Sequence, residues 1–234
     1  KTLSSVASIV LDARLPIILR GRHGIGKSEI VYQLEKTLKY TNGVIERRAS
    51  QMTEGDLMGL PSIEGNSTRW NPPDWFKYGC DNPVLIFLDE VYRAPQEGRQ
   101  GIFQLNDSRE LNGHKLHPDT VVVAAINGGE HGAEYQVGEM DPAELDRYTV
   151  FDIEPTVEDW LSWAKGTVSD IVWDFINNHR NHLEHEESYE PNKVYPSRRS
   201  WTRLDKALQL ASLHEGDMKS PLISVLAQAF VGFE

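Results

Sequence analysis

The chain of 234 residues is predicted to be an α/β protein with a helical C-terminal domain, because its pattern changes once, near Pro155. Before that point, short β-branched runs alternate with helical patterns, which is typical of βα units that build a parallel sheet. After it, only helical periodicity remains. We therefore expect a five-stranded parallel sheet in residues 1–154 and an all-helical lid domain in residues 155–234.

Runs of apolar and β-branched residues predict five strands, which are Ile17–Leu19, Val44–Arg48, Val84–Leu88, Val121–Ile126 and Thr149–Ile153. The third and fourth runs are almost wholly apolar, as in strands that are buried on both faces of a sheet. Helices are expected to begin at Lys27 and near Gln96. Ligands of such folds bind at the edge where the carboxyl ends of parallel strands meet.

Two segments do not fit a plain βα repeat. Residues 62–70 surround Gly65-Asn66, and residues 110–116 surround Asn112-Gly113. Asn and Gly supply the positive φ angles that a tight hairpin turn requires. Each segment is therefore predicted to be a β-hairpin inserted into the core.

The C-terminal region is predicted to be a small helical bundle. Thr156 caps its first helix, with Asp159 three residues on, and apolar residues recur at helical spacing in residues 157–164, 168–176 and 201–211. A last helix follows Pro221, and a polar loop over residues 184–197 separates the two halves of the bundle.

A glycine-rich segment lies between the first strand and its helix. Residues 21–28 read Gly-Arg-His-Gly-Ile-Gly-Lys-Ser, which matches the phosphate-binding loop Gly-x-x-x-x-Gly-Lys-Ser/Thr. In such a loop the backbone N–H groups surround the α- and β-phosphates, Lys27 reaches the β- and γ-phosphates, and the Ser28 hydroxyl holds Mg²⁺. The alternative, a glycine-rich surface turn, is not expected between a strand and a helix. The predicted nucleotide-binding residues are Gly21, His23, Gly24, Ile25, Gly26, Lys27, Ser28 and Glu29.

Two adjacent carboxylates follow the third predicted strand, Asp89 and Glu90. They fall at the same sheet edge as the phosphate loop. Asp89 is suited to hold Mg²⁺ together with Ser28, and Glu90 to polarise a water for in-line attack on the γ-phosphate. Taken alone, the pair could also be carboxylates favoured by the dipole of a helix N-terminus.

The chain resembles the MoxR-type AAA+ ATPases over nearly its whole length. The resemblance rests on the phosphate loop, Asp56-Leu57-Met58-Gly59, Leu88-Asp89-Glu90-Val91-Tyr92-Arg93-Ala94, Ala124-Ala125-Ile126-Asn127, Leu145-Asp146-Arg147-Tyr148 and Ser197-Arg198-Arg199-Ser200-Trp201. It implies a P-loop AAA+ core with ATP and Mg²⁺ as cofactors. It also implies that Asn127 is similar to sensor 1, that Arg147 resembles an arginine finger inserted into a neighbouring subunit's site, and that Arg199 resembles sensor 2 in the lid.

The residues themselves leave alternatives to these roles. Asn127 could belong to a turn with Gly128, and Arg147 could form a surface ion pair with Asp146 or Asp141. Arg198 and Arg203 compete with Arg199 for the lid role. The family's usual Ser-Pro-Arg reads Ser-Arg-Arg from Ser197, and Arg22-His23 and Gly128 stand where relatives often carry prolines.

Charge and composition argue against a nucleic-acid-binding protein and against a membrane-spanning one. The net charge of −11 argues against a general nucleic-acid footprint, and there is no apolar run of 18 residues to span a membrane. The single cysteine, Cys80, excludes an internal disulfide and favours a reducing cytosol. His179, His182 and His185 are expected to lie at a solvated helix end rather than in a metal site. The chain begins without Met and stops at Val-Gly-Phe-Glu, so the sequence leaves open whether it is a fragment of a longer protein.

The favoured function is therefore an ATP hydrolase that remodels a partner protein, as MoxR-like chaperones do. A finger supplied by a neighbour requires a closed ring, a hexamer by resemblance. The alternative is a nucleic-acid motor or restriction-type translocase, suggested by Arg109, His114 and Lys115 around the second hairpin. A nucleotide-gated scaffold with negligible turnover is the third reading, and GTP in place of ATP stays open.

Overall fold

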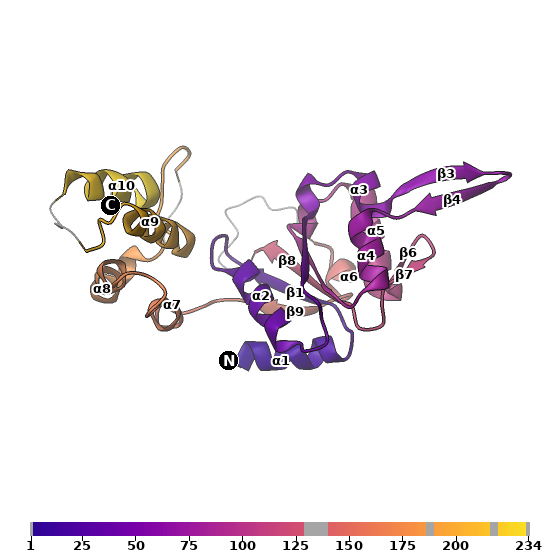
Figure 1. Cartoon of the computed structure of the whole chain (residues 1–234), viewed down its shortest axis with the longest axis horizontal. Coiled ribbons are helices and arrows are strands. Elements are labelled where there is room, and N and C mark those ends of the chain that lie inside the picture. The colour runs from indigo at the N-terminus through magenta and orange to yellow at the C-terminus, as the bar shows by residue number, and fades with distance from the viewer. Residues whose placement is uncertain (1, 129–139, 186–189, 216–219, 233–234) are drawn as a thin grey trace. The chain divides into compact units, whose positions relative to one another are not determined.

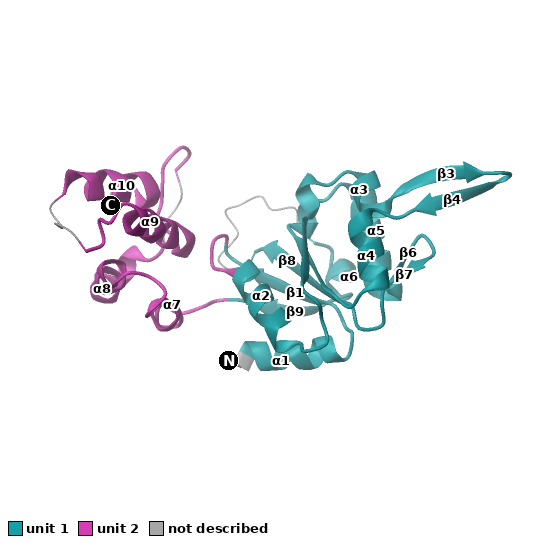
Figure 2. Ribbon diagram, in the orientation of Figure 1, with its two compact units in different colours: residues 1–22, 27–153 teal, residues 23–26, 154–234 magenta. Residues whose placement is uncertain are grey.

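The computed structural model describes residues 2–128, 140–185, 190–215 and 220–232. The chain divides into two compact units (Figure 2). Unit 1 contains residues 1–22 and 27–153, and unit 2 contains residues 23–26 and 154–234. Each unit is described by itself below. That they act as a nucleotide-binding core, 1–154, and a lid, 155–234, stays a prediction.

Unit 1 is built on the predicted five-stranded parallel sheet (Figure 1). Its strands lie in the order β2-β5-β8-β1-β9, and each neighbouring pair is parallel. Their bounds are β1 Ile17–Gly21, β2 Val44–Arg48, β5 Leu85–Asp89, β8 Val121–Asn127 and β9 Thr149–Asp152. The fold-class prediction is confirmed, and β1, β5 and β8 are the central strands.

Both faces of the central strands are buried. One face contributes Ile18, Ile86 and Leu88 to a core shared with Leu57, Phe76 and Ile102 of the helices α3 (Glu54–Met58), α4 (Asp74–Asp81) and α5 (Gln96–Ser108). The alternate residues, such as Ile17, Leu19 and Phe87, are buried as well. Because successive side chains of a strand point to opposite faces, they face α1 (Thr2–Asp12) and α2 (Lys27–Thr37).

The start of α5 at Gln96 and of α2 at Lys27 matches the sequence prediction. The helices α1, α3 and α4 and the short α6 (Pro142–Leu145) were not predicted, nor were the 3₁₀ turns η1 (Ala49–Gln51) and η2 (Val91–Arg93). A capping box explains where α3 begins, since the Thr53 and Asp56 side chains bond each other's backbone N–H.

Both predicted hairpins are present in unit 1. The first pairs β3 (Leu60–Glu64) with β4 (Ser67–Asn71) and projects away from α3 and α5 (Figure 1). The second pairs β6 (Glu110–Leu111) with β7 (His114–Lys115). The two are joined, because His114 Nε2 lies 3.0 Å from the Trp70 carbonyl oxygen. Asn112 Nδ2 also donates to the Met58 carbonyl at the base of the first hairpin, over 2.9 Å.

Unit 2 contains the predicted helices, as α7 (Val157–Ala164), α8 (Asp170–Asn178), α9 (Arg198–Leu210) and α10 (Pro221–Val231), with a 3₁₀ turn η3 (Arg180–His182). The predicted cap of α7 is present as a capping box of Thr156 and Asp159. Trp160, Val172, Trp201 and Leu204 are among the residues of its apolar core. In the described part of the chain, no helix is both long and apolar enough to cross a membrane.

Candidate functional site

The glycine-rich loop joins the end of β1 to the start of α2. Gly24 and Gly26 have φ angles of 80° and 96°, which side-chain-bearing residues rarely adopt. An added Cβ at Gly26 would meet no atom within 4 Å, so open space lies beside the loop there. The sequence thus places glycines where the loop needs positive φ, and Ser28 and Glu29 follow in the first turn of α2.

Lys27 is held at this strand edge. Its side chain is buried, and its Nζ donates to the Gly21 and Arg22 carbonyls, each over 2.9 Å. A third bond, of 2.8 Å, runs to Asn127 Oδ1 at the end of β8. Gly21 and Asn127 are partners in the β1–β8 register, which is why the two side chains meet. A phosphate bound at the loop would replace these oxygens as the partner of the Lys27 ammonium.

The Asn127 side chain has a second partner. Its Nδ2 donates to the Tyr92 hydroxyl over 3.4 Å, and Tyr92 is buried in η2. The amide thus turns Oδ1 to Lys27 and Nδ2 to Tyr92. The alternative that Asn127 is only a turn residue is not supported, because it ends β8 and bonds Lys27.

Asp89 and Glu90 follow β5, the strand next to β8. Asp89 accepts from the Glu90 N–H through Oδ1, over 3.0 Å. Burial raises the pKa of Asp89, and the neighbouring Glu90 charge raises it further. Positive charge on Lys27 and Arg48 opposes both effects. A divalent cation beside Asp89 would do the same more strongly.

The Glu90 backbone is in the left-handed region, with φ 56° and ψ 39°. This conformation is uncommon for a residue with a side chain and costs free energy. Its carboxylate is held by Ser50 of η1, whose Oγ donates to Glu90 Oε2 over 2.5 Å. The carboxylate is therefore fixed by a residue from the segment after β2.

These residue types fit a nucleotide with Mg²⁺. The Ser28 hydroxyl and the Asp89 carboxylate are hard oxygen ligands of the kind that Mg²⁺ prefers. Lys27 and the N-terminus of α2 supply positive charge for phosphate oxygens. The site therefore suits binding of a nucleoside triphosphate and polarisation of a water by Glu90.

Arg147 lies away from this set, just after α6. Its Nε donates to Asp107 Oδ2 over 2.9 Å and its Nη1 to the Ala143 carbonyl over 2.6 Å. The ion pair considered for Arg147 is thus real, but Asp107 of α5 takes the place of Asp146 or Asp141. The described contacts of Arg147 do not join it to Lys27, Asp89 or Glu90.

The three lid arginines differ in their surroundings. Arg198 is buried and pairs with Glu184, Nε to Oε1 over 3.0 Å, and it also donates to the Pro155 and Thr156 carbonyls. Arg203 is exposed. Arg199 is exposed too, and within unit 2 its Nη1 lies 3.4 Å from His23 Nε2 of the loop. Arg198 is a structural residue of the lid, and Arg199 remains the candidate sensor.

Three side chains that contact predicted site residues were not identified from the sequence: Ser50, which bonds Glu90, Tyr92, which bonds Asn127, and Asp107, which bonds Arg147. Ser50 comes two residues after a predicted strand, and that position could have marked it. Tyr92 lies within the segment Leu88 to Ala94, which carries part of the family resemblance. Asp107 is on the last turn of α5, and no local motif points to it.

The weaker candidates are not supported. Burial raises the pKa of Cys80 to about 11, with Asp81 adding to the effect, so its thiolate is disfavoured. Within the described residues there is no group of three side chains that could hold a metal ion. The expectation of a solvated helix end is wrong for His185, which is buried and stacks on Tyr195 with ring centroids 4.1 Å apart.

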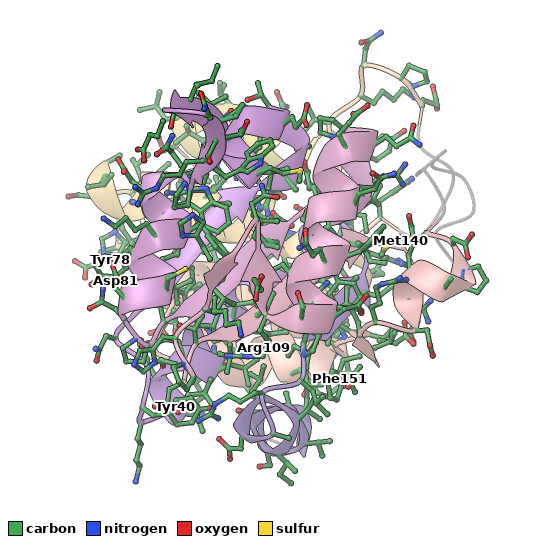
Figure 3. All side chains as sticks on the ribbon, turned by 90° about the vertical axis from the view of Figure 1, so that its right-hand side faces the viewer. Tyr40, Tyr78, Asp81, Arg109, Met140 and Phe151 are labelled. Atoms are coloured by element: carbon green, nitrogen blue, oxygen red, sulfur yellow. The ribbon has the colours of Figure 1, made fainter. Side chains whose placement is uncertain are left out.

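The cations around the second hairpin differ: Arg109 is held by backbone carbonyls, whereas the Lys115 side chain is exposed. Arg109 donates to the carbonyls of His117, Pro118 and Thr120, and its Nη1 donates to the carbonyl of Arg14. Figure 3 labels Arg109 among the side chains. Lys115 Nζ lies 3.8 Å from Glu110 Oε2. Arg109 therefore anchors backbone instead of presenting charge to a ligand.

Comparisons with known proteins agree with this fold. A family model described as AAA domain (dynein-related subfamily) matches residues 16–148, more than half of the chain. No curated protein matches the sequence. Among solved structures, a RuvB mutant from Thermotoga maritima aligns with a TM-score of 0.57 and 11% identity, over 100% of this chain and 71% of that one. At this identity the likeness shows the fold alone.

Proposed function

Since the chain belongs to the dynein-related subfamily of AAA domains, and so to the AAA+ ATPases, we propose that it is a MoxR-type ATP hydrolase that remodels or activates a partner protein. The observation that best supports the proposed hydrolase activity is the 2.8 Å hydrogen bond from Lys27 to Asn127. Asp89 and Glu90 lie at the end of β5, the strand next to β8. The loop that follows β1, Asn127 at the end of β8 and Asp89 at the end of β5 thus lie at one edge of three adjacent strands, which supports a role in phosphoryl transfer.

Each residue has a proposed task. Lys27 leaves its carbonyl partners and binds the β- and γ-phosphates, while Gly21, His23, Gly24, Ile25, Gly26 and Glu29 complete the loop around them. Ser28 and Asp89 hold Mg²⁺, which neutralises charge on the phosphates. Glu90 polarises the attacking water and Asn127 orients it.

The remaining charge compensation is proposed to come from arginines outside this cluster. Arg199 of the lid acts as sensor 2. Arg147 serves a neighbouring subunit as an arginine finger, because its own contacts keep it on α5 and α6. Hydrolysis then requires a ring, which the family resemblance suggests is a hexamer in the cytosol.

The nucleic-acid motor is the weaker reading. The support for this reading was the basic second hairpin. The Arg109 guanidinium, however, donates to backbone carbonyls, and Lys115 lies near the Glu110 carboxylate. A DNA-stimulated ATPase activity that falls steeply with salt would restore this reading.

The experiment that tests the hydrolase is Glu90→Gln. The amide keeps the shape of the carboxylate but cannot polarise water, so phosphate release should fall by roughly 10²- to 10⁴-fold while ATP binding persists. Glu97→Gln, at an exposed site at the start of α5, is the matched control and should retain turnover. Unchanged phosphate release by Glu90→Gln would sink the assignment. The same variant binds ATP without hydrolysing it, so pull-downs in the presence of ATP then identify the partner. Repeating them with GTP shows which nucleotide the protein uses.

A further inference from the structure

One face of α5 contacts α6 and the nearby Arg147. Arg99, Phe103 and Asp107 follow each other at intervals of four residues and so share this face. Arg99 Nη1 lies 3.9 Å from Glu144 of α6. Phe103 and Asp107 both contact Arg147 itself. This face of α5 thus packs against α6 and against Arg147, which lies two residues after the end of α6.

The guanidinium of Arg147 is fixed on three sides. Asp107 Oδ2 accepts from Nε over 2.9 Å, and the Ala143 carbonyl accepts from Nη1 over 2.6 Å. The Phe103 ring centroid lies 5.3 Å from Cζ, within the range of a cation–π contact. A flexible side chain held at three points has little freedom left.

The bonds leave one edge of the guanidinium available. Of its nitrogens, Nη2 makes no hydrogen bond to any residue that the structure describes, and the side chain is 33% exposed. Two N–H groups on one nitrogen therefore remain for an acceptor supplied from outside. Nε and Nη1, by contrast, are directed to their own subunit.

Asp107 stands at a place where helix electrostatics do not favour it. It lies in the last turn of α5, where the dipole favours cations over carboxylates. Its side chain is 53% exposed, and an ion pair at such a site contributes little to stability. The pair is thus better explained by what it does to Arg147 than by a gain in folding free energy.

We propose that Asp107 is a positioning residue that holds Arg147 ready, with its Nη2 edge free, for the phosphates in a neighbouring subunit's site. This rests on the proposed role of Arg147 as a finger in trans. A finger acts on charge that develops in the transition state, so its orientation affects turnover more than nucleotide binding. Asp107 acts on the neighbour's site and leaves the site of its own chain untouched.

The first test compares Asp107→Ala with Asp107→Asn and with Asp146→Asn. Asp107→Ala should lower kcat about 10- to 100-fold with KM for ATP nearly unchanged, since only orientation is lost. Asp107→Asn keeps an acceptor oxygen for Nε and should recover part of the rate. Asp146→Asn removes the same charge one residue from Arg147, at an exposed position, and should leave kcat as it is. A rise in kcat for Asp107→Ala would mean that the pair restrains the finger and would overturn the proposal.

The second test asks which subunit carries the defect. Asp107→Ala chains mixed with Lys27→Ala chains should regain turnover, because the competent sites then receive an intact finger. Wild-type chains mixed with the Lys27→Ala, Asp107→Ala double variant should lose turnover relative to wild type mixed with Lys27→Ala. A defect that follows the hydrolysing chain contradicts the proposal.

The variant Arg147→Ala distinguishes failure of the proposed finger role of Arg147 from failure of the proposed positioning role of Asp107. If Arg147→Ala in proven assemblies hydrolyses ATP normally, the finger assignment fails and the role of Asp107 fails with it. If Arg147→Ala is inactive while Asp107→Ala is fully active, the finger stands and only the positioning role is wrong.

Discussion

At the scale of single residues, Ser50 is the side chain on which the Glu90 geometry depends. Its hydroxyl donates to Glu90 Oε2, and Glu90 itself has an uncommon left-handed backbone. We expect Ser50→Ala to lower kcat roughly 10-fold, because the carboxylate loses its orientation toward the attacking water. Ser50→Thr retains the hydroxyl and should keep most of the rate. Steady-state phosphate release measures both, and faster turnover by Ser50→Ala would contradict the expectation.

Substitutions of the two neighbouring lid arginines, Arg198 and Arg199, should have different effects on stability and turnover. Arg198→Ala leaves Glu184 and two backbone carbonyls without their donor, so we expect a loss of about 1–3 kcal/mol in the free energy of unfolding. Arg199→Ala removes an exposed side chain and should alter that free energy by less than about 0.5 kcal/mol while lowering kcat. Urea unfolding followed by circular dichroism, together with phosphate release, measures the two effects. A stable Arg198→Ala chain with a deficient kcat would instead make Arg198 the sensor.

Residues of the site differ in how far the sequence could predict them. The phosphate loop is a local motif, and Asp89 and Asn127 each end a strand that its apolar residues identify. Asp107 and Ser50 matter only through partners 40 residues away in the chain. No local pattern carries such a pairing, because it depends on how α5 packs on α6 and how η1 lies beside η2.

At the scale of elements, the central strands β5 and β8 were the most predictable, because parallel strands buried on both faces are apolar nearly throughout. The helix α1 was not predicted, although Ala7 and Leu11 are buried at helical spacing. The helices α3 and α6 span only five and four residues, too short for periodicity to show. Capping boxes at Thr53 and Asp141 were the signals left for them.

Gly59 fixes the start of the first hairpin. It has a φ of 84° and a ψ of −175°, and an added Cβ would lie 2.1 Å from the Asn71 carbonyl oxygen. That contact is far inside van der Waals distance, so Gly59→Ala must displace β4 or α3. We expect it to lower the free energy of unfolding by more than about 3 kcal/mol.

Gly65→Ala is the matched control for this prediction. Gly65 also has a positive φ, of 64°, but its added Cβ would meet no atom within 4 Å. Only backbone strain remains, which costs about 1–2 kcal/mol. Chemical denaturation of both variants measures the difference, and equal losses would mean that the close approach to Asn71 does not matter.

At the scale of the whole molecule, the charges of the proposed site are divided between chains. Lys27, Asp89 and Glu90 belong to one sheet edge, whereas the Arg147 guanidinium is bound to α5 and α6. A single chain should therefore bind nucleotide without efficient turnover. Specific ATPase activity should rise with protein concentration as neighbours associate.

Mixing two inactive variants tests this division directly. Arg147→Ala chains keep a complete phosphate loop and Glu90, and Lys27→Ala chains keep the finger. In a random equal mixture, roughly one quarter of the sites in a closed ring combine an intact Lys27 with an intact neighbouring Arg147, and turnover should return in that proportion. The double variant mixed with Lys27→Ala has no such site and should stay inactive. If tagged pull-downs prove co-assembly and the first mixture still releases no phosphate, Arg147 does not act across a subunit boundary, because one quarter of the sites would then combine an intact phosphate loop with an intact Arg147 from the neighbour and still fail to hydrolyse ATP.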